Sequence, residues 1–548
     1  MTWPQFKKKW SRYTGKESSA YQSHFNDLCQ LLGQPTPADA DPTGSESFCF
    51  QKRVVKDAEL LLLKEDTADY DKEGDRGFAD VWKKDCFAWE YKGKKKNLDE
   101  AYRQLLRYRE SLLNPPLLVV CDFDRYIVRT NFNGAVQETH EFTNANIDTP
   151  ENIRILRALF TDPEGLRPVH TASKVTEDLA KQIAAVARSL QDREAIEFTD
   201  ARTRAQVNVA QKKKLRIARF LNRIIFCLFA EDIKLLPDGI FSDLAKQGVD
   251  DPVFFAERLE ALFRVMAKGG NFGTQKIRYF NGHLFEDSTV FELTPDEIRQ
   301  LAEASESRWE SIEPKIMGTL FERALDPDHR AQLGAHYTSE EDIKTLVEPV
   351  LMQPLRREWR EIKRELVSLV VGRKPSPTRP EPSLPGSEPS RGVGSAAVVG
   401  RVPSRGASLA EARATLKKFL KKLSTITVLD PACGSGNFLY ISLQLLLSLE
   451  KEVIAFATQL DFTFAPQVGV QQLKAIELNA YAFELAQVSV QIGYLQWLRD
   501  NGFQIDRSPR EPPRHGPPRC KPPLRDPYRV GPHWRDPQPR ESQRCKPR

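Results

Sequence analysis

Residues 426–438 decide the fold of the second half of the chain, and they read Ile426-Thr427-Val428-Leu429-Asp430-Pro431-Ala432-Cys433-Gly434-Ser435-Gly436-Asn437-Phe438. The apolar and β-branched residues at the start predict a buried strand. The two glycines predict a tight turn that can approach a ligand without Cβ clashes, and the apolar residues 439–449 predict a helix. This order of elements indicates a parallel α/β unit.

The complete string is more specific than its glycines, because a bare Gly-x-Gly also occurs at ordinary helix N-termini. It resembles motif I, the S-adenosyl-L-methionine-binding motif of amino-methylating DNA methyltransferases. Downstream, Leu473–Glu477 is expected to be a second strand that ends in an acid for the ribose hydroxyls. Upstream, Leu333–Thr338 resembles motif X, although Ser339 replaces the usual proline. The resemblance implies S-adenosyl-L-methionine as cofactor, with the binding residues Tyr337, Thr338, Asp430, Ala432, Gly434, Gly436, Asn437, Phe438 and Glu477.

A second constellation lies near the N-terminus. Residues 78–82 and 86–92 flank a short polar turn and predict a β-hairpin. Side chains alternate along a strand, so Glu90 and Lys92 share one face, and the partner strand brings Asp80 near them. Two carboxylates can hold Mg²⁺, and an adjacent lysine can orient or deprotonate a water and offset phosphate charge. Most acid-x-Lys pairs on strands are surface ion pairs, so the pattern alone also fits a structural role.

The hairpin and the helix that follows it, which contains Gln104, together resemble the PD-(D/E)xK nuclease core of MmeI-like single-chain restriction–modification enzymes. The resemblance implies that Asp80 and Glu90 bind the metal and that Asp80, Glu90 and Lys92 are catalytic. The first core helix would contain Glu17, whose contact with the metal the sequence leaves open. Segments in the middle of the chain resemble the helical spacer of the same enzymes.

The resemblance covers the chain except for its last 42 residues and predicts an α/β multidomain fold. We expect a PD-(D/E)xK nuclease-like α/β domain at residues 1–150 and a helical spacer at 151–310. The N-terminal part of a Rossmann-like methyltransferase domain is expected at 311–506. Residues 373–408 are rich in Pro, Ser, Gly and Arg, and residues 507–548 contain twelve Pro and ten Arg. We expect them to be a disordered insertion and a disordered tail, because they cannot bury enough apolar surface to fold.

Methyltransferases of this class hold the flipped base with an Asn/Asp/Ser-Pro-Pro-aromatic motif. The near match at 114–117 lacks the aromatic and lies in the nuclease part, and the near match at 526–528 lacks a proline. We therefore expect a cofactor-binding half without the catalytic half, as in a truncated or frame-shifted product, and no methyl transfer by this chain.

Composition excludes several other classes. Apolar residues make up 40% of the chain and charged residues 28%, and no apolar run approaches the roughly 18 residues of a membrane span. The first residues lack the pattern of a signal peptide. None of the eight cysteines forms a C-x-x-C pair, which argues against a zinc cluster and favours a reducing cytoplasm. No Walker lysine motif indicates ATP.

We therefore expect the N-terminal portion of a restriction–modification enzyme that acts on double-stranded DNA. It would combine a Mg²⁺-dependent endonuclease with part of an adenine-N6 methyltransferase, the choice of adenine resting on the resemblance alone. Two alternatives stay open: a methyltransferase whose N-terminal domain only binds DNA, and an inactive DNA-binding remnant. Metal-dependent cleavage by the N-terminal domain would separate the first alternative from a nuclease.

Overall fold

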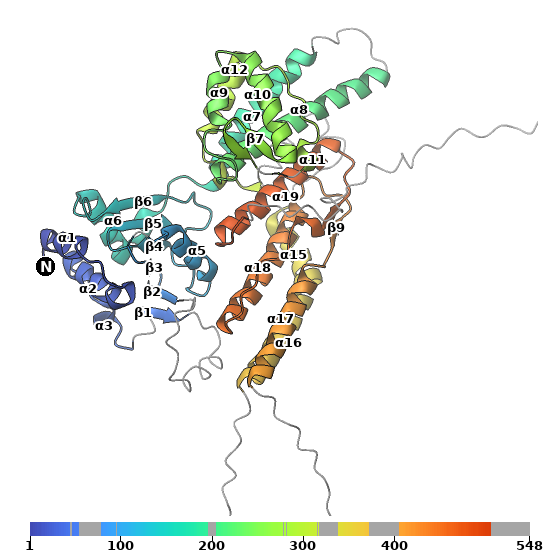
Figure 1. Ribbon diagram of the computed structural model, residues 1–548. Helices are drawn as coiled ribbons and strands as arrows, with labels where there is room; N and C mark the ends of the chain where they lie inside the picture. The colour runs from blue at the N-terminus through green and yellow to red at the C-terminus, as the bar shows by residue number, and fades with distance from the viewer. Residues whose placement is uncertain are drawn as a thin grey trace, which may run out of the picture.

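The computed structural model has three successive groups of elements (Figure 1). It describes residues 1–43, 47–53, 78–94, 96–195, 204–277, 279–280, 282–314, 316, 338–371 and 405–505. Tyr337, most of the expected insertion and the expected tail lie outside these residues. None of the described helices is long and apolar enough to cross a membrane.

The N-terminal group is built on one six-stranded sheet. Its strands, in spatial as well as chain order, are β1 (Phe48–Arg53), β2 (Phe78–Lys83), β3 (Phe87–Tyr91), β4 (Leu117–Cys121), β5 (Arg125–Thr130) and β6 (Thr139–Thr143). Neighbouring strands are antiparallel except β3 and β4, which are parallel. The expected hairpin is confirmed as β2 and β3, and the apolar run at 117–121 is β4. All residues of β3 and β4 are buried, so helices must cover both faces of the sheet.

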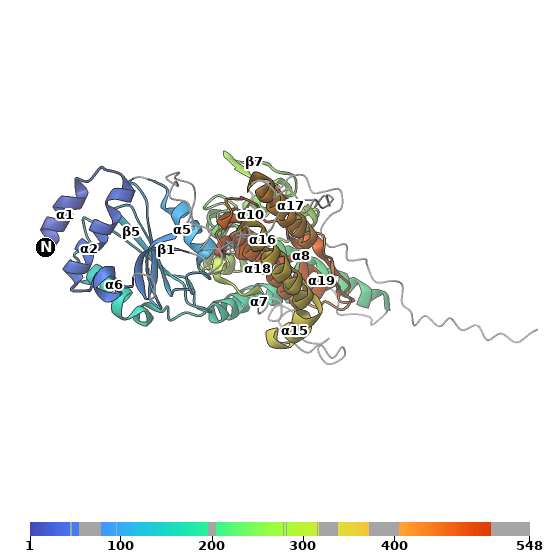
Figure 2. The same ribbon diagram turned by 90° about the horizontal axis from the view of Figure 1, so that it is seen from below.

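Helices α1 (Trp3–Ser11), α2 (Tyr21–Leu32) and α6 (Pro150–Thr161) cover one face of this sheet, and α5 (Leu98–Tyr108) covers the other (Figure 2). A one-turn helix, α3 (Pro37–Ala40), precedes β1. Residues 1–32 form two separate helices, α1 and α2, and Glu17, expected in the first core helix, lies in a 3-10 turn between them. Lys94 Nζ donates to the carbonyls of Trp10 and Ser11, and this satisfies carbonyl groups at the end of α1. A side chain more than 80 positions away thus helps to end the helix.

The middle group is helical, as the sequence predicts, and buries one large apolar cluster. Its helices are α7 (Ala172–Ala195), α8 (Arg204–Asp232), α9 (Ser242–Gly248), α10 (Pro252–Lys268), α11 (Gly282–Phe285) and α12 (Pro295–Ser305). A small hairpin of β7 (Gly270–Phe272) and β8 (Gln275–Ile277), which the periodicity did not predict, follows α10.

The third group contains the expected order of strand, turn, helix, strand and helix. Its elements are α15 (Glu340–Val347), α16 (Gln353–Val371), α17 (Arg405–Leu423), β9 (Val428–Asp430), α18 (Asn437–Gln459), β10 (Leu473–Ala475) and α19 (Ala480–Asp500). β9 and β10 pair in parallel, with Val428 opposite Leu473. The expectation of a buried strand at 426–429 is wrong in its burial, since Leu429 is 60% exposed. Within the described residues β9 pairs only with β10. A sheet of two strands is too small to bury the side chains on both of its faces.

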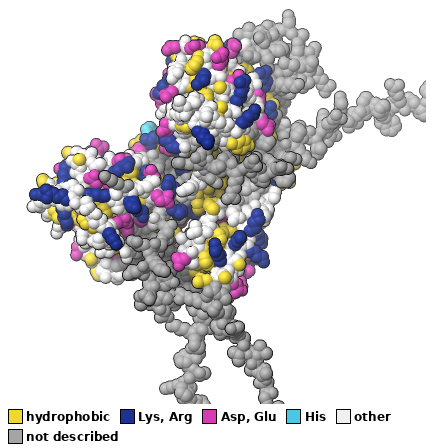
Figure 3. Space-filling model, in the orientation of Figure 1, with side chains coloured by type: hydrophobic (Ala, Val, Ile, Leu, Met, Phe, Trp, Pro, Cys, Tyr) yellow, Lys and Arg dark blue, Asp and Glu magenta, His cyan; other side chains and the backbone are white. Residues whose placement is uncertain are grey.

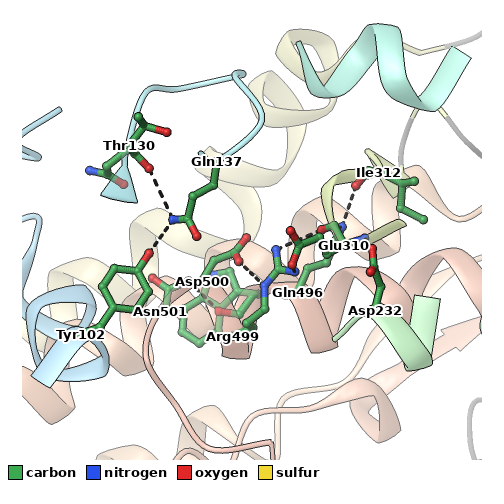
Figure 4. Close-up of polar contacts among 12 residues, drawn as sticks. Tyr102, Thr130, Gln137, Asp232, Glu310, Ile312, Gln496, Arg499, Asp500 and Asn501 are labelled. Atoms are coloured by element: carbon green, nitrogen blue, oxygen red, sulfur yellow. Dashed lines mark hydrogen bonds and ion pairs between the residues drawn. The ribbon is translucent and has the colours of Figure 1, made fainter. Parts of the chain in front are cut away.

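The C-terminal end of α19 lies where the three groups meet (Figure 4). Arg499 Nη2 donates to the carbonyl of Glu310 at 3.0 Å, and Gln496 Nε2 donates to the carbonyl of Ile312 at 2.6 Å. On the side of the sheet, the amide of Gln137 donates to the Tyr102 hydroxyl of α5. Gln496 and Arg499 thus join the third group to the middle group, and Arg308 Nη1 joins the middle group to the N-terminal group by donating to the carbonyl of Gln137 at 2.9 Å.

Candidate functional site

The pairing of β2 with β3 places the first set of candidate residues. Val81 lies opposite Trp89, so Asp80 and Glu90 occupy the next position along the antiparallel pair. Asp80 Oδ2 accepts a hydrogen bond from the backbone N–H of Tyr91 at 2.7 Å. The carboxylate thereby reaches across to the neighbouring strand beside Glu90. The structure brings these two acids together as the hairpin predicts.

Lys92 completes the cluster just after β3. Its Nζ lies 2.9 Å from Glu90 Oε1 and 3.4 Å from Gln104 Oε1, the latter on α5. Glu90 is 4% exposed, and its second carboxylate oxygen, Oε2, is buried without a hydrogen-bond partner. Leaving such an acceptor unpaired costs about 1–3 kcal/mol, and more for a charged group. An unpaired oxygen on a carboxylate with a second acid on the neighbouring strand is suited to a cation.

The protonation of this cluster follows from its burial. Burial raises the pKa of Asp80 to about 7, and the charge of Glu17 adds to the rise, although the Tyr91 N–H and Lys92 oppose it. Burial, and next the charge of Asp80, raise the pKa of Glu90 well above its usual range. Burial lowers the pKa of Lys92, but the charge and hydrogen bond of Glu90, together with the charges of Glu17 and Asp80, outweigh this and the pKa is raised overall. Two acids that resist being charged together are stabilised as anions by a divalent cation.

The donor set fits Mg²⁺, which takes hard oxygen ligands and keeps several waters. No set of three His, Cys, Asp or Glu side chains in the described part of the chain is arranged as a metal cluster. Asp80 and Glu90 would therefore hold the ion with water or phosphate oxygens in the remaining positions. Glu17 lies in the 3-10 turn before α2, and its charge raises the pKa values of Asp80, Glu90 and Lys92. A contact between Glu17 and the metal stays a prediction.

A buried histidine that sequence reasoning missed supports β3 from the opposite face. His24 Nδ1 and Nε2 lie 2.9 Å from the hydroxyls of Tyr91 and Tyr126. The Asn144 amide donates to the carbonyl of Phe123, so its oxygen accepts from Tyr126. Tyr126 must then accept from His24 Nε2–H, and Nδ1 must accept from Tyr91. One neutral tautomer therefore satisfies the whole chain of bonds.

The second set of candidate residues surrounds the loop between β9 and α18. Glu477 Oε2 accepts from the backbone N–H of Gly434 at 2.7 Å, and its Oε1 accepts from the N–H of Asn479 at 2.8 Å. The N–H of Cys433 donates to the carbonyl of Ile476, and the N–H of Ile476 donates to the carbonyl of Asp430, so backbone bonds also fasten these two loops together. Glu477 therefore holds the glycine loop in shape, a role that the sequence did not indicate.

The loop leaves room for a ligand at one glycine and none at the other. Gly434 has φ +51°, and a Cβ built there would meet nothing within 4 Å. Gly436 has φ +89°, and its Cβ would lie 3.1 Å from the Cβ of Ala486 on α19. Gly434 is thus open toward solvent, whereas Gly436 allows two helices to pack closely. Its position at the N-terminus of α18 places Asn437 and Phe438 in the first helical turn, where backbone N–H groups are free to bind anions.

Asp430 offers a second free acceptor beside this opening. Its Oδ1 accepts from the N–H of Ala432 at 3.1 Å, while Oδ2 is buried without a partner. Burial, and next the charge of Glu477, raise the pKa of Asp430. A ligand with hydroxyl or amino donors would satisfy that oxygen, so these residues fit a nucleoside cofactor. Thr338 is half-buried just before α15, which packs on α18, and Tyr337 lies outside the described residues.

Three domain families match consecutive parts of the chain. They are the MmeI N-terminal domain at residues 1–193, the MmeI helicase spacer domain at 215–285 and the MmeI DNA-methyltransferase domain at 407–507. The order of the matches is the order of the three structural groups.

Two curated relatives are similar in sequence. DNA methyltransferase A of Bacillus subtilis (strain 168) is 25% identical over 282 residues, covering 50% of this chain and 27% of the relative. A protein inferred to be a type II restriction enzyme and methyltransferase of Methanocaldococcus jannaschii is 22% identical over 325 residues, covering 52% and 25%. The chain thus spans about a quarter of the length of these relatives.

Two solved structures are also similar. The type IIL restriction–modification enzyme MmeI in complex with DNA aligns with a TM-score of 0.45 and 22% identity, over 63% of this chain and 40% of that one. The DrdV–DNA complex aligns with a TM-score of 0.27 and 12% identity, over 92% and 39%.

Proposed function

The chain belongs to the MmeI-like type IIL restriction–modification enzymes, and from this premise we propose that its two clusters cleave DNA and bind S-adenosylmethionine. The cleavage site is the cluster of Asp80, Glu90 and Lys92. The observation that carries it is the buried, unpaired Oε2 of Glu90, a carboxylate whose other oxygen binds Lys92 and which faces the charge of Asp80. Duplex DNA is the proposed substrate, and the cytoplasm the proposed location.

Each residue of the cleavage site has a separate role in this proposal. Asp80 and Glu90 would hold Mg²⁺, which when bound polarises a phosphate oxygen and acidifies water. Lys92, oriented by Glu90 and Gln104, keeps its proton in this arrangement, because the charge of Glu90 raises its pKa. Its ammonium can therefore neutralise charge that develops on the phosphate and orient the attacking water.

The cofactor site is proposed at the glycine loop. Gly434 would lie against the methionine part of S-adenosylmethionine, and Glu477 against the ribose. Both oxygens of Glu477 already accept backbone N–H groups, but each carboxylate oxygen can accept a further bond. The ribose hydroxyls can therefore bind without releasing the loop. Asp430 Oδ2 and the first turn of α18 would supply the remaining polar contacts.

Methyl transfer is a separate matter from cofactor binding. The printed sequence holds no Asn/Asp/Ser-Pro-Pro-aromatic motif. Without it no aromatic stacks on an extruded base and no side chain orients the target amine. We propose that this chain binds the cofactor without methylating DNA. Incubation with tritiated cofactor and mixed-sequence DNA should give no incorporation above background, whereas incorporation that is lost in Gly436→Trp would contradict this.

Cleavage is tested with a matched pair of lysine variants. Lys92→Ala should abolish Mg²⁺-dependent nicking of duplex DNA by the full chain. Lys96→Ala, four residues further on at an exposed position of the same loop, should cleave like the parent. If both variants cleave equally well, the nuclease assignment fails. If neither the parent nor any variant cleaves although all bind DNA, an N-terminal domain that only binds DNA becomes the better account.

A further inference from the structure

Positive charge is concentrated in one part of the third group. Residues 353–423 contain 16 Lys and Arg against 6 Asp and Glu, a net charge of +10, while the whole chain carries +6. Residues 507–548 contain 12 against 4, or +8. The other 435 residues therefore carry −12. The segment from α16 to α17 is a strongly basic part of an otherwise acidic chain.

Helices α16 and α17 lie side by side and form an arm that projects from the molecule (Figure 1). The rings of Trp359 and Phe419 stack between them, with centroids 5.6 Å apart and planes 17° apart. Ala412, Leu416 and Leu420 are buried on the same side of α17. The charged residues are thereby left on the outer surface, where Lys and Arg side chains gather in the lower part of Figure 3.

The outer face of α17 carries cations that lack acidic neighbours. Arg413, Lys417 and Lys421 follow one another at intervals of four residues, with Lys418 beside them, and all four are exposed. Within the described residues none of the four forms an ion pair, nor do the exposed Arg357, Arg360 and Arg364 of α16, whereas Arg356 of α16 pairs with Glu348. The stripe from 413 to 421 extends over about 12 Å at 1.5 Å per residue. This length matches the rise of three to four base pairs, about 3.4 Å each, along the axis of a DNA duplex.

An ordinary solvated helix face looks different, and α7 shows how. Its exposed Lys174 and Lys181 lie within 3.5 Å of Glu177 or Asp178, so opposite charges alternate along the helix. Like charges four residues apart instead destabilise a helix by about 0.2–0.5 kcal/mol per pair. The face of α17 therefore carries a small electrostatic cost that a polyanion would remove.

We propose that the outer face of α17 binds the sugar–phosphate backbone of duplex DNA, without regard to sequence. The choice of DNA as the polyanion rests on the proposed function. The contact is separate from both chemical clusters, because none of Arg413, Lys417, Lys418 and Lys421 belongs to either. It would add affinity and retain DNA while the cluster of Asp80, Glu90 and Lys92 acts on it.

Binding measured without chemistry tests this proposal. We would compare the full parent chain with a variant in which Arg413, Lys417, Lys418 and Lys421 are all changed to Gln. Fluorescence anisotropy with a mixed-sequence duplex of about 30 base pairs, in EDTA and without cofactor, measures Kd at a series of NaCl concentrations from about 50 to about 250 mM. Each lost phosphate contact lowers the slope of log Kd against log salt by about 0.9, so a fall of about 2 to 4 is expected. At about 0.1 M NaCl the variant should bind at least about tenfold more weakly.

The matched control removes the same charge where each cation already has an acidic neighbour. Its substitutions to Gln are at Lys174, Lys181, Lys234 and Lys246. This control should keep the slope of the parent. An unchanged slope in the α17 variant, or an equal loss in the control, would overturn the proposal. The slope is measured in EDTA, where no Mg²⁺-dependent cleavage occurs, whereas the nuclease assignment is tested by nicking with Mg²⁺, so failure of the nuclease assignment and failure of the α17 contact give different results.

Discussion

Lys451 Nζ on α18 lies 2.7 Å from Glu110 Oε2, just beyond α5, and so joins the methyltransferase part to the N-terminal domain across 341 sequence positions. The same ammonium donates to the carbonyl of Leu106 at 3.0 Å and to Asn501 Oδ1 at 2.8 Å. Lys451 is 7% exposed. A buried lysine is stable only where its donors are matched, and here acceptors from α5 and from the end of α19 supply that match.

The close approach of Gly502, just beyond α19, to the backbone of α5 predicts the effect of one glycine substitution. Gly502 has φ +72°, and a Cβ there would lie 2.2 Å from the carbonyl oxygen of Arg103 in α5. Gly502→Ala therefore combines backbone strain with a clash against the backbone of another domain. Gly33→Ala is the matched control, because Gly33 has φ +68° and nothing within 4 Å of its Cβ.

We expect Gly33→Ala to cost about 1–2 kcal/mol from strain alone. Gly502→Ala should cost roughly 1–3 kcal/mol more, and amides of α5 should exchange faster with deuterium. Urea unfolding and hydrogen exchange of the two variants measure this. Equal effects in both would show that α5 and the end of α19 do not pack as described.

The buried histidine predicts a pH dependence of stability. Burial, and next the charges of Lys9 and Lys94, lower the pKa of His24 from 6.5 to about 3. The unfolded chain therefore binds a proton at His24 between about pH 6.5 and 3 that the folded chain does not. The stability that the neutral ring provides is present above pH 6.5 and is lost as the pH falls toward 3. The slope from this group is about 1.4 kcal/mol per pH unit.

His24→Gln should be less stable at pH 7.5 but should lose less stability than the parent between pH 6.5 and 4.5. The control is His170→Gln, at an exposed position, which should retain the slope of the parent. Urea midpoints at several pH values separate the two. A variant slope identical to that of the parent would show that His24 is charged in the folded protein or solvated.

Glu477 predicts a specific pattern of cofactor affinity. Losing a carboxylate–hydroxyl contact should weaken S-adenosylmethionine by about 1.5–3 kcal/mol, or roughly 10- to 150-fold, in Glu477→Ala. Because Glu477 also holds the N–H of Gly434, the variant alone cannot separate the two roles. A cofactor analogue without the ribose hydroxyls can separate them.

The parent should bind the analogue more weakly than the natural cofactor. The Glu477→Ala variant should bind the analogue and the natural cofactor about equally well. Calorimetry of the four combinations gives the coupling between carboxylate and hydroxyls. If the analogue loses the same factor in parent and variant, Glu477 shapes the loop and does not contact the ribose.

The sequence predicted most of what depends on neighbouring residues. The hairpin of β2 and β3 and the order of elements around β9 and β10 follow from local patterns, which alternation and glycine placement reveal. The site residues carried over by resemblance remain proposals. Glu477 illustrates the limit, because its bond to Gly434 joins residues 43 positions apart and the spacing alone gives no hint of it.

Other features depended on packing that no local pattern encodes. The apolar side chain of Leu429 suggested a buried strand, but its exposure depends on the number of strands that pair with β9. The break between α1 and α2 depends partly on Lys94 from a distant loop. His24 is one histidine on an amphipathic helix, and only the approach of Tyr91 and Tyr126 gives it a defined protonation.

The most direct measurement of the central claim is the binding of a divalent cation to the cluster of Asp80, Glu90 and Lys92. Mn²⁺ titrated by calorimetry into the full chain should show a site that Glu90→Gln weakens by more than the roughly 10- to 100-fold that a supporting residue costs. Glu138→Gln, at a half-buried position of the same domain outside the cluster, should bind like the parent. Equal Mn²⁺ affinity in parent, Glu90→Gln and Glu138→Gln would contradict the account.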